Sequence, residues 1–135
     1  MQKNMKIDDK LLDSLTEQAK SSPRLRMNFD LRNSPDDQSQ RMLNAIEPGS
    51  VVPVHRHQKS SETVVVMRGR IVEMFFDELG RMVEDTVEVS REGPCYAVNV
   101  PMGRWHTLHS LESGTVIMEI KDGRYEPMRP EDVLY

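Results

Sequence analysis

Three histidines and one glutamate are the residues of this chain whose types and spacing could do chemistry. His55 and His57 are two residues apart in a β-rich run, so both imidazoles would face the same side of a strand. Glu62 opens the next run, where a tight turn can bring its carboxylate back beside them. His106 follows the turn-forming residues 101–103 and can add an imidazole from another strand. Imidazoles and a carboxylate that meet at one point are typical ligands of a first-row divalent metal.

The residues at fixed spacings around these four make the evidence for a metal site stronger than an isolated His-x-His pair would. The two spacing patterns are Gly49-x5-His55-x-His57-x4-Glu62-x6-Gly69 and Pro101-x-Gly103-x-x-His106. For this composition, the five-point pattern arises by chance in roughly one sequence in tens of thousands, which favours a metal site over ordinary structural histidines. His109, three residues beyond His106, would face the other side of a strand and is left out of the ligand set.

Both patterns resemble the two cupin motifs, the first at every fixed position and the second in its core. The second motif departs at its ends, because Gly93 lies two residues further from the proline than usual and Ser110 stands where asparagine is common. More narrowly, the chain resembles the small WbuC-type cupin metalloproteins. The stretches that carry this resemblance are SPRLRMN at 22–28, HRH at 55–57, KSSE at 59–62, WHT at 105–107 and E-x-K-x-G-x-Y at 119–125.

The resemblance implies an all-β fold, the cupin double-stranded β-helix or jelly-roll barrel. It implies that His55, His57, Glu62 and His106 surround one divalent metal ion per chain (Fe, Mn, Zn or Ni), and that the protein is a homodimer. WbuC is named for a component encoded among bacterial surface-polysaccharide genes, and its reaction is unassigned.

Hydrophobic periodicity predicts the elements that must position these residues. Apolar residues at helical spacing predict an amphipathic helix over 7–20, capped by Asp8 or Asp9 and ended before Pro23. Residues 24–40 are polar and are expected to form an ordered arm or a loop. We expect helix and arm, residues 1–40, to pack on a barrel of residues 41–135 in a single domain. The period then changes to two, which predicts strands at 42–46, 51–54, 63–67, 71–76, 82–89, 96–100, 105–108 and 115–120.

Composition disfavours several classes of protein. The 135 residues hold 18 Lys and Arg against 22 Asp and Glu, a net charge of −4, which argues against nucleic-acid binding. The longest apolar run, 64–67, is far too short to span a membrane, and residues 1–10 lack the apolar region of a secretory signal. The single cysteine, Cys95, fits a reducing cytoplasm.

A site with three imidazoles and one carboxylate leaves two positions of a six-coordinate metal open. We expect an enzyme that acts on a small polar or sugar-like substrate in surface-polysaccharide metabolism. Two alternatives stay open: a non-catalytic metal-dependent binding or sensing module, and a metal-free epimerase that uses a His–Tyr pair. Because metal ligands must be deprotonated, metal release and loss of stability are expected as the pH falls through the histidine range.

Several residues are candidates for binding an anionic or sugar-like ligand at the mouth of the barrel. Arg24, Arg26 and Asn28 could form an anion clamp, because arginine offers paired donors to carboxylate or phosphate. Lys59 could serve likewise, and the Tyr125 hydroxyl could hold a ligand. An ordinary solvated surface is the equally open alternative for these side chains.

Overall fold

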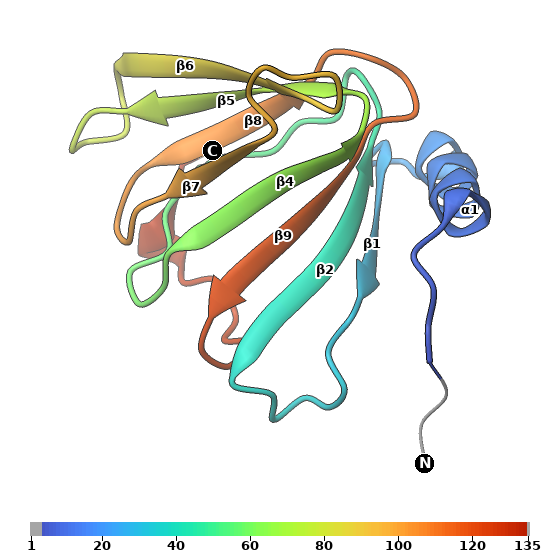
Figure 1. Ribbon diagram of the computed structural model, residues 1–135. Coiled ribbons are helices and arrows are strands. Elements are labelled where there is room, and N and C mark those ends of the chain that lie inside the picture. Colours follow the sequence, from blue (N-terminus) through green and yellow to red (C-terminus); the bar gives the residue numbers. More distant parts are fainter. Residues whose placement is uncertain (1–3, 135) are drawn as a thin grey trace.

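The computed structural model describes residues 4–134, which form two facing five-stranded sheets with one helix outside them (Figure 1). The strand orders are β1-β2-β9-β4-β7 and β10-β3-β8-β5-β6, and every pairing is antiparallel. In chain order the elements are α1 (Asp9–Ser21), β1 (Arg26–Asp30), β2 (Ser39–Ile46), β3 (Val54–His55), β4 (Glu62–Arg68), β5 (Arg70–Phe76), β6 (Val83–Ser90), β7 (Ala97–Val100), β8 (His106–Ser110), β9 (Val116–Asp122), a 3-10 turn (Pro130–Asp132) and β10 (Val133–Leu134).

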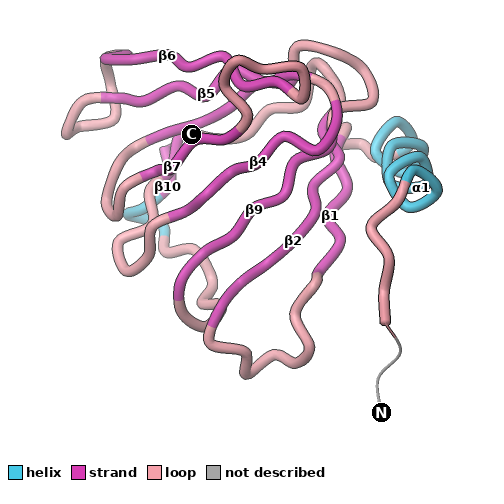
Figure 2. The backbone as a smooth tube through the Cα atoms, viewed as in Figure 1, coloured by secondary structure: helices cyan, strands magenta, loops and turns pink. Residues whose placement is uncertain are grey.

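The chain crosses repeatedly from one sheet to the other, which is the jelly-roll path expected from the sequence (Figure 2). Alternate residues of the strands point between the sheets and are shielded from water. This inner core consists of Ile46, Val64, Val66, Ile71, Val89, Leu108 and Ile117. The expected fold class, an all-β barrel with an N-terminal helix, is therefore confirmed.

Helix α1 lies on the outer face of the first sheet. Its cap is Asp8, whose side chain accepts a hydrogen bond from the backbone N–H of Leu11 at 3.1 Å. Leu12, Leu15 and Ala19 are buried against the outward-facing side chains of β1, β2 and β9. Within residues 4–134, no helix has both the length and the apolar composition that crossing a bilayer requires.

Part of the segment expected to be a polar arm or a loop is the strand β1. Its residues alternate, with Met27 and Phe29 packed towards the helix, while Arg26, Asn28 and Asp30 face the other side of the sheet. The strand forms because this alternation lets it extend the sheet beside β2. The expected strand at 51–54 is also displaced, to the two-residue β3, and β10 has no counterpart among the expected strands.

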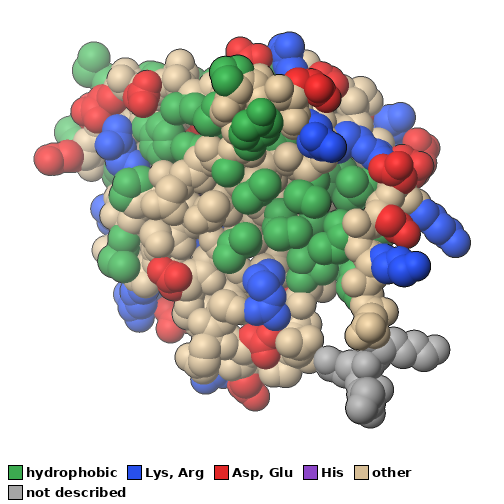
Figure 3. Space-filling model, in the orientation of Figure 1, with side chains coloured by type: hydrophobic (Ala, Val, Ile, Leu, Met, Phe, Trp, Pro, Cys, Tyr) green, Lys and Arg blue, Asp and Glu red, His purple; other side chains and the backbone are tan. Residues whose placement is uncertain are grey.

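Gly69 makes the tight turn between β4 and β5. Its φ is +83°, and a Cβ there would lie 2.8 Å from the Thr115 Cα, so both the backbone conformation and the space require glycine. In the view of Figure 3, hydrophobic and charged side chains lie among other polar side chains and backbone, and no histidine is seen on this face. The histidines that matter for the site lie between the sheets.

Candidate metal centre

The candidate ligands come from separate strands that the fold brings to one point. His55 ends β3 and is paired directly with His106, the first residue of β8. His57 follows β3 by two residues, and Glu62 begins β4 in the opposite sheet. The structure therefore places all four expected ligands in one cluster between the two sheets.

The ligand atoms of these four residues lie within 4.8 Å of one another. Glu62 Oε2 is 3.0 Å from His57 Nε2 and 3.9 Å from His106 Nε2. Metal–ligand bonds of about 2.0–2.2 Å allow two ligand atoms to be at most about 4.4 Å apart, so only a small contraction would be needed. The cluster could hold one metal ion.

Unpaired polar atoms support this interpretation. His57 Nε2, Glu62 Oε2 and His106 Nε2 are buried, and none has a hydrogen-bond partner among the described residues. The 3.0 Å contact between His57 Nε2 and Glu62 Oε2 does not meet the geometry of a hydrogen bond. Buried polar atoms without partners are costly, and a cation at this point would satisfy all three.

Hydrogen bonds on the far side of two rings fix their orientation. His55 Nδ1 lies 2.8 Å from the carbonyl oxygen of Pro53, and His106 Nδ1 lies 2.7 Å from Glu73 Oε1. When both Nδ1 atoms donate, both Nε2 atoms carry the lone pair that a metal needs. The fully buried Glu73 was missed in the sequence, although its charge stands on the apolar, inward-facing phase of β5.

Burial sets the protonation states of the cluster. Desolvation lowers the pKa of His55 to about 3 and that of His106 to about 4, so both rings are neutral at physiological pH. Burial alone would raise the pKa of Glu62, but the contact with His57 and the charge of Lys121 hold it below its usual range. Neutral imidazoles beside an ionised carboxylate are the states that metal binding requires.

The short strand β3 is held in place by the segment around β10. Val133 pairs with His55, and the Asp132 side chain accepts hydrogen bonds from Arg56 Nε at 2.9 Å and Gln58 Nε2 at 2.6 Å. The Arg56 guanidinium also lies 4.6 Å from the centre of the Trp105 ring. These contacts support the ligand-bearing segment 55–57 along the edge of β3 that faces away from β8.

A cavity of about 160 Å³ lies against the inner side of β1, β2 and β9. We call it the barrel cavity, and its lining residues are Asn28, Asp30, Arg32, Gln40, Arg41, Met42, Glu119, Lys121 and Tyr125. Lys121 pairs directly across the sheet with Glu62, so this wall of the cavity lies next to one of the candidate ligands. Burial and the nearby Glu62 charge raise the pKa of Glu119, in the same wall, to about 8.

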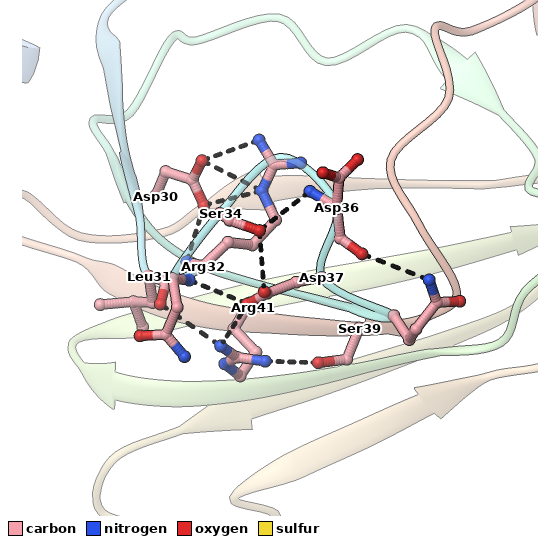
Figure 4. A network of polar contacts seen from close by, with 10 residues as sticks. Asp30, Leu31, Arg32, Ser34, Asp36, Asp37, Ser39 and Arg41 are labelled. Carbon is pink, nitrogen blue, oxygen red and sulfur yellow. Dashed lines mark hydrogen bonds and ion pairs between the residues drawn. The ribbon is translucent and has the colours of Figure 1, made fainter.

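Polar contacts order the loop after β1, at one end of the barrel cavity (Figure 4). Asp37 accepts hydrogen bonds from Arg41 Nη2 at 3.1 Å and from the backbone N–H of Asn33 at 2.8 Å. Arg32 and Asp30 form an ion pair at 2.8 Å. This wall of the cavity is therefore built from charges that already neutralise one another.

The structure brings some of the expected ligand-binding residues to the cavity and not others. Asn28 and Tyr125 line it, whereas Arg24 and Lys59 are exposed outside it. Arg26 faces the inner side of the sheet, and its Nη1 donates to the carbonyl oxygen of Val51 at 2.6 Å. His109 is exposed on the other face of β8 from His106, as the strand alternation predicts.

Residues 7–88 match a family model described as domain of unknown function (DUF6016). No curated protein shows significant sequence similarity to the chain.

Solved structures of cupin-fold proteins share the architecture. KdgF from Halomonas sp. superposes with a TM-score of 0.61 at 16% identity, over 77% of this chain and 84% of that one. A sugar phosphate isomerase from a cupin superfamily of Silicibacter pomeroyi gives 0.57 at 19% identity, over 74% and 60%. The capsular polysaccharide assembling protein CapF from Staphylococcus aureus gives 0.63 at 20% identity, over 84% of this chain but only 32% of CapF. At these identities the likeness establishes the cupin fold.

Proposed function

Since the chain belongs to the family of domains of unknown function DUF6016, we propose its function from the site: a metal-dependent cupin enzyme that acts on a small polar or sugar-like substrate. The observation that carries this proposal is the group of three buried, unpaired ligand atoms, His57 Nε2, Glu62 Oε2 and His106 Nε2. His55, His57, Glu62 and His106 would hold one Fe, Mn, Zn or Ni ion. Such an ion can polarise a substrate oxygen or lower the pKa of bound water.

The barrel cavity favours catalysis over the alternative of a non-catalytic binding or sensing module. Four protein ligands leave two positions of a six-coordinate metal open, and the cavity could hold a small molecule beside them, because its wall includes Lys121, the residue directly opposite Glu62. Glu119 faces this space beside Glu62 and could exchange a proton with a bound substrate. Asn28 and Tyr125 would contact the substrate, and Arg26, on the same face of β1 as Asn28, could reach it from outside the cavity lining. Arg24 and Lys59 could reach only a ligand that extends beyond the cavity.

The biological setting is a finer proposal. The resemblance to WbuC-type cupins and the fold shared with CapF support a role in surface-polysaccharide metabolism in the cytoplasm. We propose in addition that the protein is a homodimer, which light scattering after size-exclusion chromatography would test. Because β1 is a strand of the first sheet, we propose that residues 1–40 and 41–135 form a single domain.

Elemental analysis tests the metal site. Protein purified without chelator should contain one first-row metal per chain, and His106→Ala should lose it. The matched control is His109→Ala, which removes the exposed histidine three residues away and should retain the metal. Wild-type protein that takes up no stoichiometric metal, or equal losses in the two variants, would exclude the proposed site. His57→Ala, at a half-buried position, checks the result if His106→Ala does not fold.

Substrate turnover distinguishes an enzyme from a binding module. Metal-loaded wild-type protein should convert sugars or sugar nucleotides in oxidation, isomerisation or hydrolysis assays, and His57→Ala should abolish conversion. Saturable ligand binding without turnover in these assays would favour the binding module.

A further inference from the structure

One cation in the wall of the barrel cavity, Lys121, makes no direct ion pair among the described residues, although its charge lowers the pKa of the neighbouring Glu62. Arg32 is paired with Asp30, and Arg41 with Asp37. Lys121 forms no ion pair with any residue of the described range 4–134, although it is half-buried. A half-buried ammonium group facing a cavity is a natural contact for the anionic group of a ligand.

The position of Lys121 connects the cavity with the metal cluster. It stands directly opposite Glu62 in the pairing of β9 with β4, and residues directly opposite have side chains about 5 Å apart. A molecule in the cavity that reached the open metal positions would therefore pass beside the Lys121 ammonium. Part of the resemblance to WbuC-type cupins lies in the E-x-K-x-G-x-Y stretch at 119–125. Its residues Glu119, Lys121 and Tyr125 all line the cavity, so the stretch would contact a ligand there.

Several of the remaining lining residues offer hydrogen-bond partners for hydroxyl groups. Asn28 offers an amide, and Tyr125 offers a phenolic hydroxyl. Gln40 donates its amide N–H to the carbonyl oxygen of Arg124 at 3.3 Å, which leaves its own oxygen as an acceptor. The cavity volume of about 160 Å³ lies below the roughly 300–1,000 Å³ of sites for drug-sized ligands. The cavity therefore fits a small molecule, and these side chains could bind its hydroxyl groups.

We infer that Lys121 binds the carboxylate of a monosaccharide-sized sugar acid whose hydroxyl groups contact Asn28 and Gln40. This inference rests on the proposed function, because the sugar acid would occupy the cavity beside the bound metal. A single lysine matches one negative charge, and the two arginines that line the cavity are already paired with Asp30 and Asp37, so they offer no free cation for the second charge of a phosphate group. Selectivity for carboxylate over phosphate is therefore part of the inference.

Calorimetry with three sugars tests the inference on protein loaded with one equivalent of Zn²⁺. D-glucuronate should bind at least about tenfold more tightly than D-glucose, which lacks the charge, and more tightly than D-glucose 6-phosphate. Lys121→Gln should reduce the preference for glucuronate over glucose to less than about twofold. The matched control is Lys59→Gln, which removes an exposed lysine outside the cavity and should keep the full preference.

The outcomes separate this inference from the proposed function. Equal binding of glucuronate and glucose, tighter binding of glucose 6-phosphate, binding of none of the three, or a preference that survives in Lys121→Gln would each overturn the inference. Zn²⁺ content, measured on every variant, reports the metal site independently, and Lys121→Gln should keep one equivalent. Failure of the wild-type protein to bind Zn²⁺ would overturn both proposals.

Discussion

Replacing Glu73 by glutamine should affect metal binding and metal-free stability in opposite directions. Glu73 is fully buried, and its Oε1 lies 2.7 Å from His106 Nδ1. Glutamine has nearly the same shape and can still accept a hydrogen bond from the ring, but unlike glutamate it cannot ionise when a cation binds to that ring. Mutation of such a partner of a metal-binding histidine typically weakens metal affinity 10–100-fold, or about 1.4–2.7 kcal/mol.

The metal-free protein should respond differently, because burial and the charge of Glu62 raise the pKa of Glu73 to about 9. At pH 7 the folded state keeps a proton on this carboxyl group, whereas the unfolded state releases it. Relative to an ordinary pKa of 4.5, this difference costs about 3 kcal/mol at pH 7. Glutamine avoids that cost, so Glu73→Gln should raise the free energy of unfolding of metal-free protein by up to about 3 kcal/mol. Since the penalty exists only above the pKa of the unfolded state, the gain should disappear as the pH falls to about 4.5.

Chelator competition and thermal unfolding with and without metal would measure both effects. The matched control is Glu47→Gln, at a buried carboxylate that accepts hydrogen bonds from Ser113 Oγ and the Gly114 N–H. That variant should lose about 1–2 kcal/mol of stability and keep its metal affinity. If Glu73→Gln instead lost stability without metal and bound metal as tightly as the wild type, Glu73 would be only a structural residue.

Three further predictions follow from the site and its supports. The pKa values of His55 and His106 are about 3 and 4, so protons do not compete with metal at either ring until the pH nears 4. The metal affinity should therefore fall by no more than about tenfold per pH unit between pH 6.5 and 4.5. A steeper fall in chelator competition would contradict this. Asp132→Ala should lower the free energy of unfolding in denaturant by about 1–3 kcal/mol and weaken metal binding, because Arg56 and Gln58 lose their buried hydrogen-bond acceptor. An unchanged metal affinity would show that metal binding does not depend on these contacts. Gly69→Ala should lower the melting temperature by many degrees, because the new Cβ would lie 2.8 Å from the Thr115 Cα. Gly123→Ala has open space around it and should lower the free energy of unfolding by only about 1–2 kcal/mol. Equal losses of stability in the two variants would refute the steric argument.

The pH prediction changes an expectation drawn from the sequence alone. Ordinary imidazoles would lose metal as the pH fell through about 6.5. Desolvation between the two sheets moves the competing protonation of His55 and His106 well below that range. The spacing of ligands in a sequence does not reveal how deeply they are buried, so this shift could not be anticipated.

The ligand set could be predicted because its pattern is local in the sequence. His55, His57 and Glu62 lie within eight consecutive residues, and the turn before His106 carries its own motif. Strand alternation alone placed His109 on the opposite face from His106, as the structure shows.

The surroundings of the ligands depend on contacts between distant strands. Glu73 reaches His106 only because β5 and β8 pair in the register that sets Phe75 opposite His106. Lys121 lies beside the cluster only because β9 pairs with β4. The two-residue strands β3 and β10 are too short to show a hydrophobic period in the sequence. The five-residue alternation of β1 could not be distinguished from a loop, because polar residues precede and follow it.

The pairing of Val133 with His55 has a consequence for how the protein matures. During translation the segment bearing His55 and His57 leaves the ribosome long before the residues that will flank it. Until residues 132–134 have emerged, β3 has a strand neighbour on one side at most, and its histidines are not fixed. Metal would therefore be acquired only after residues 132–134 have joined the sheet beside the ligand-bearing segment.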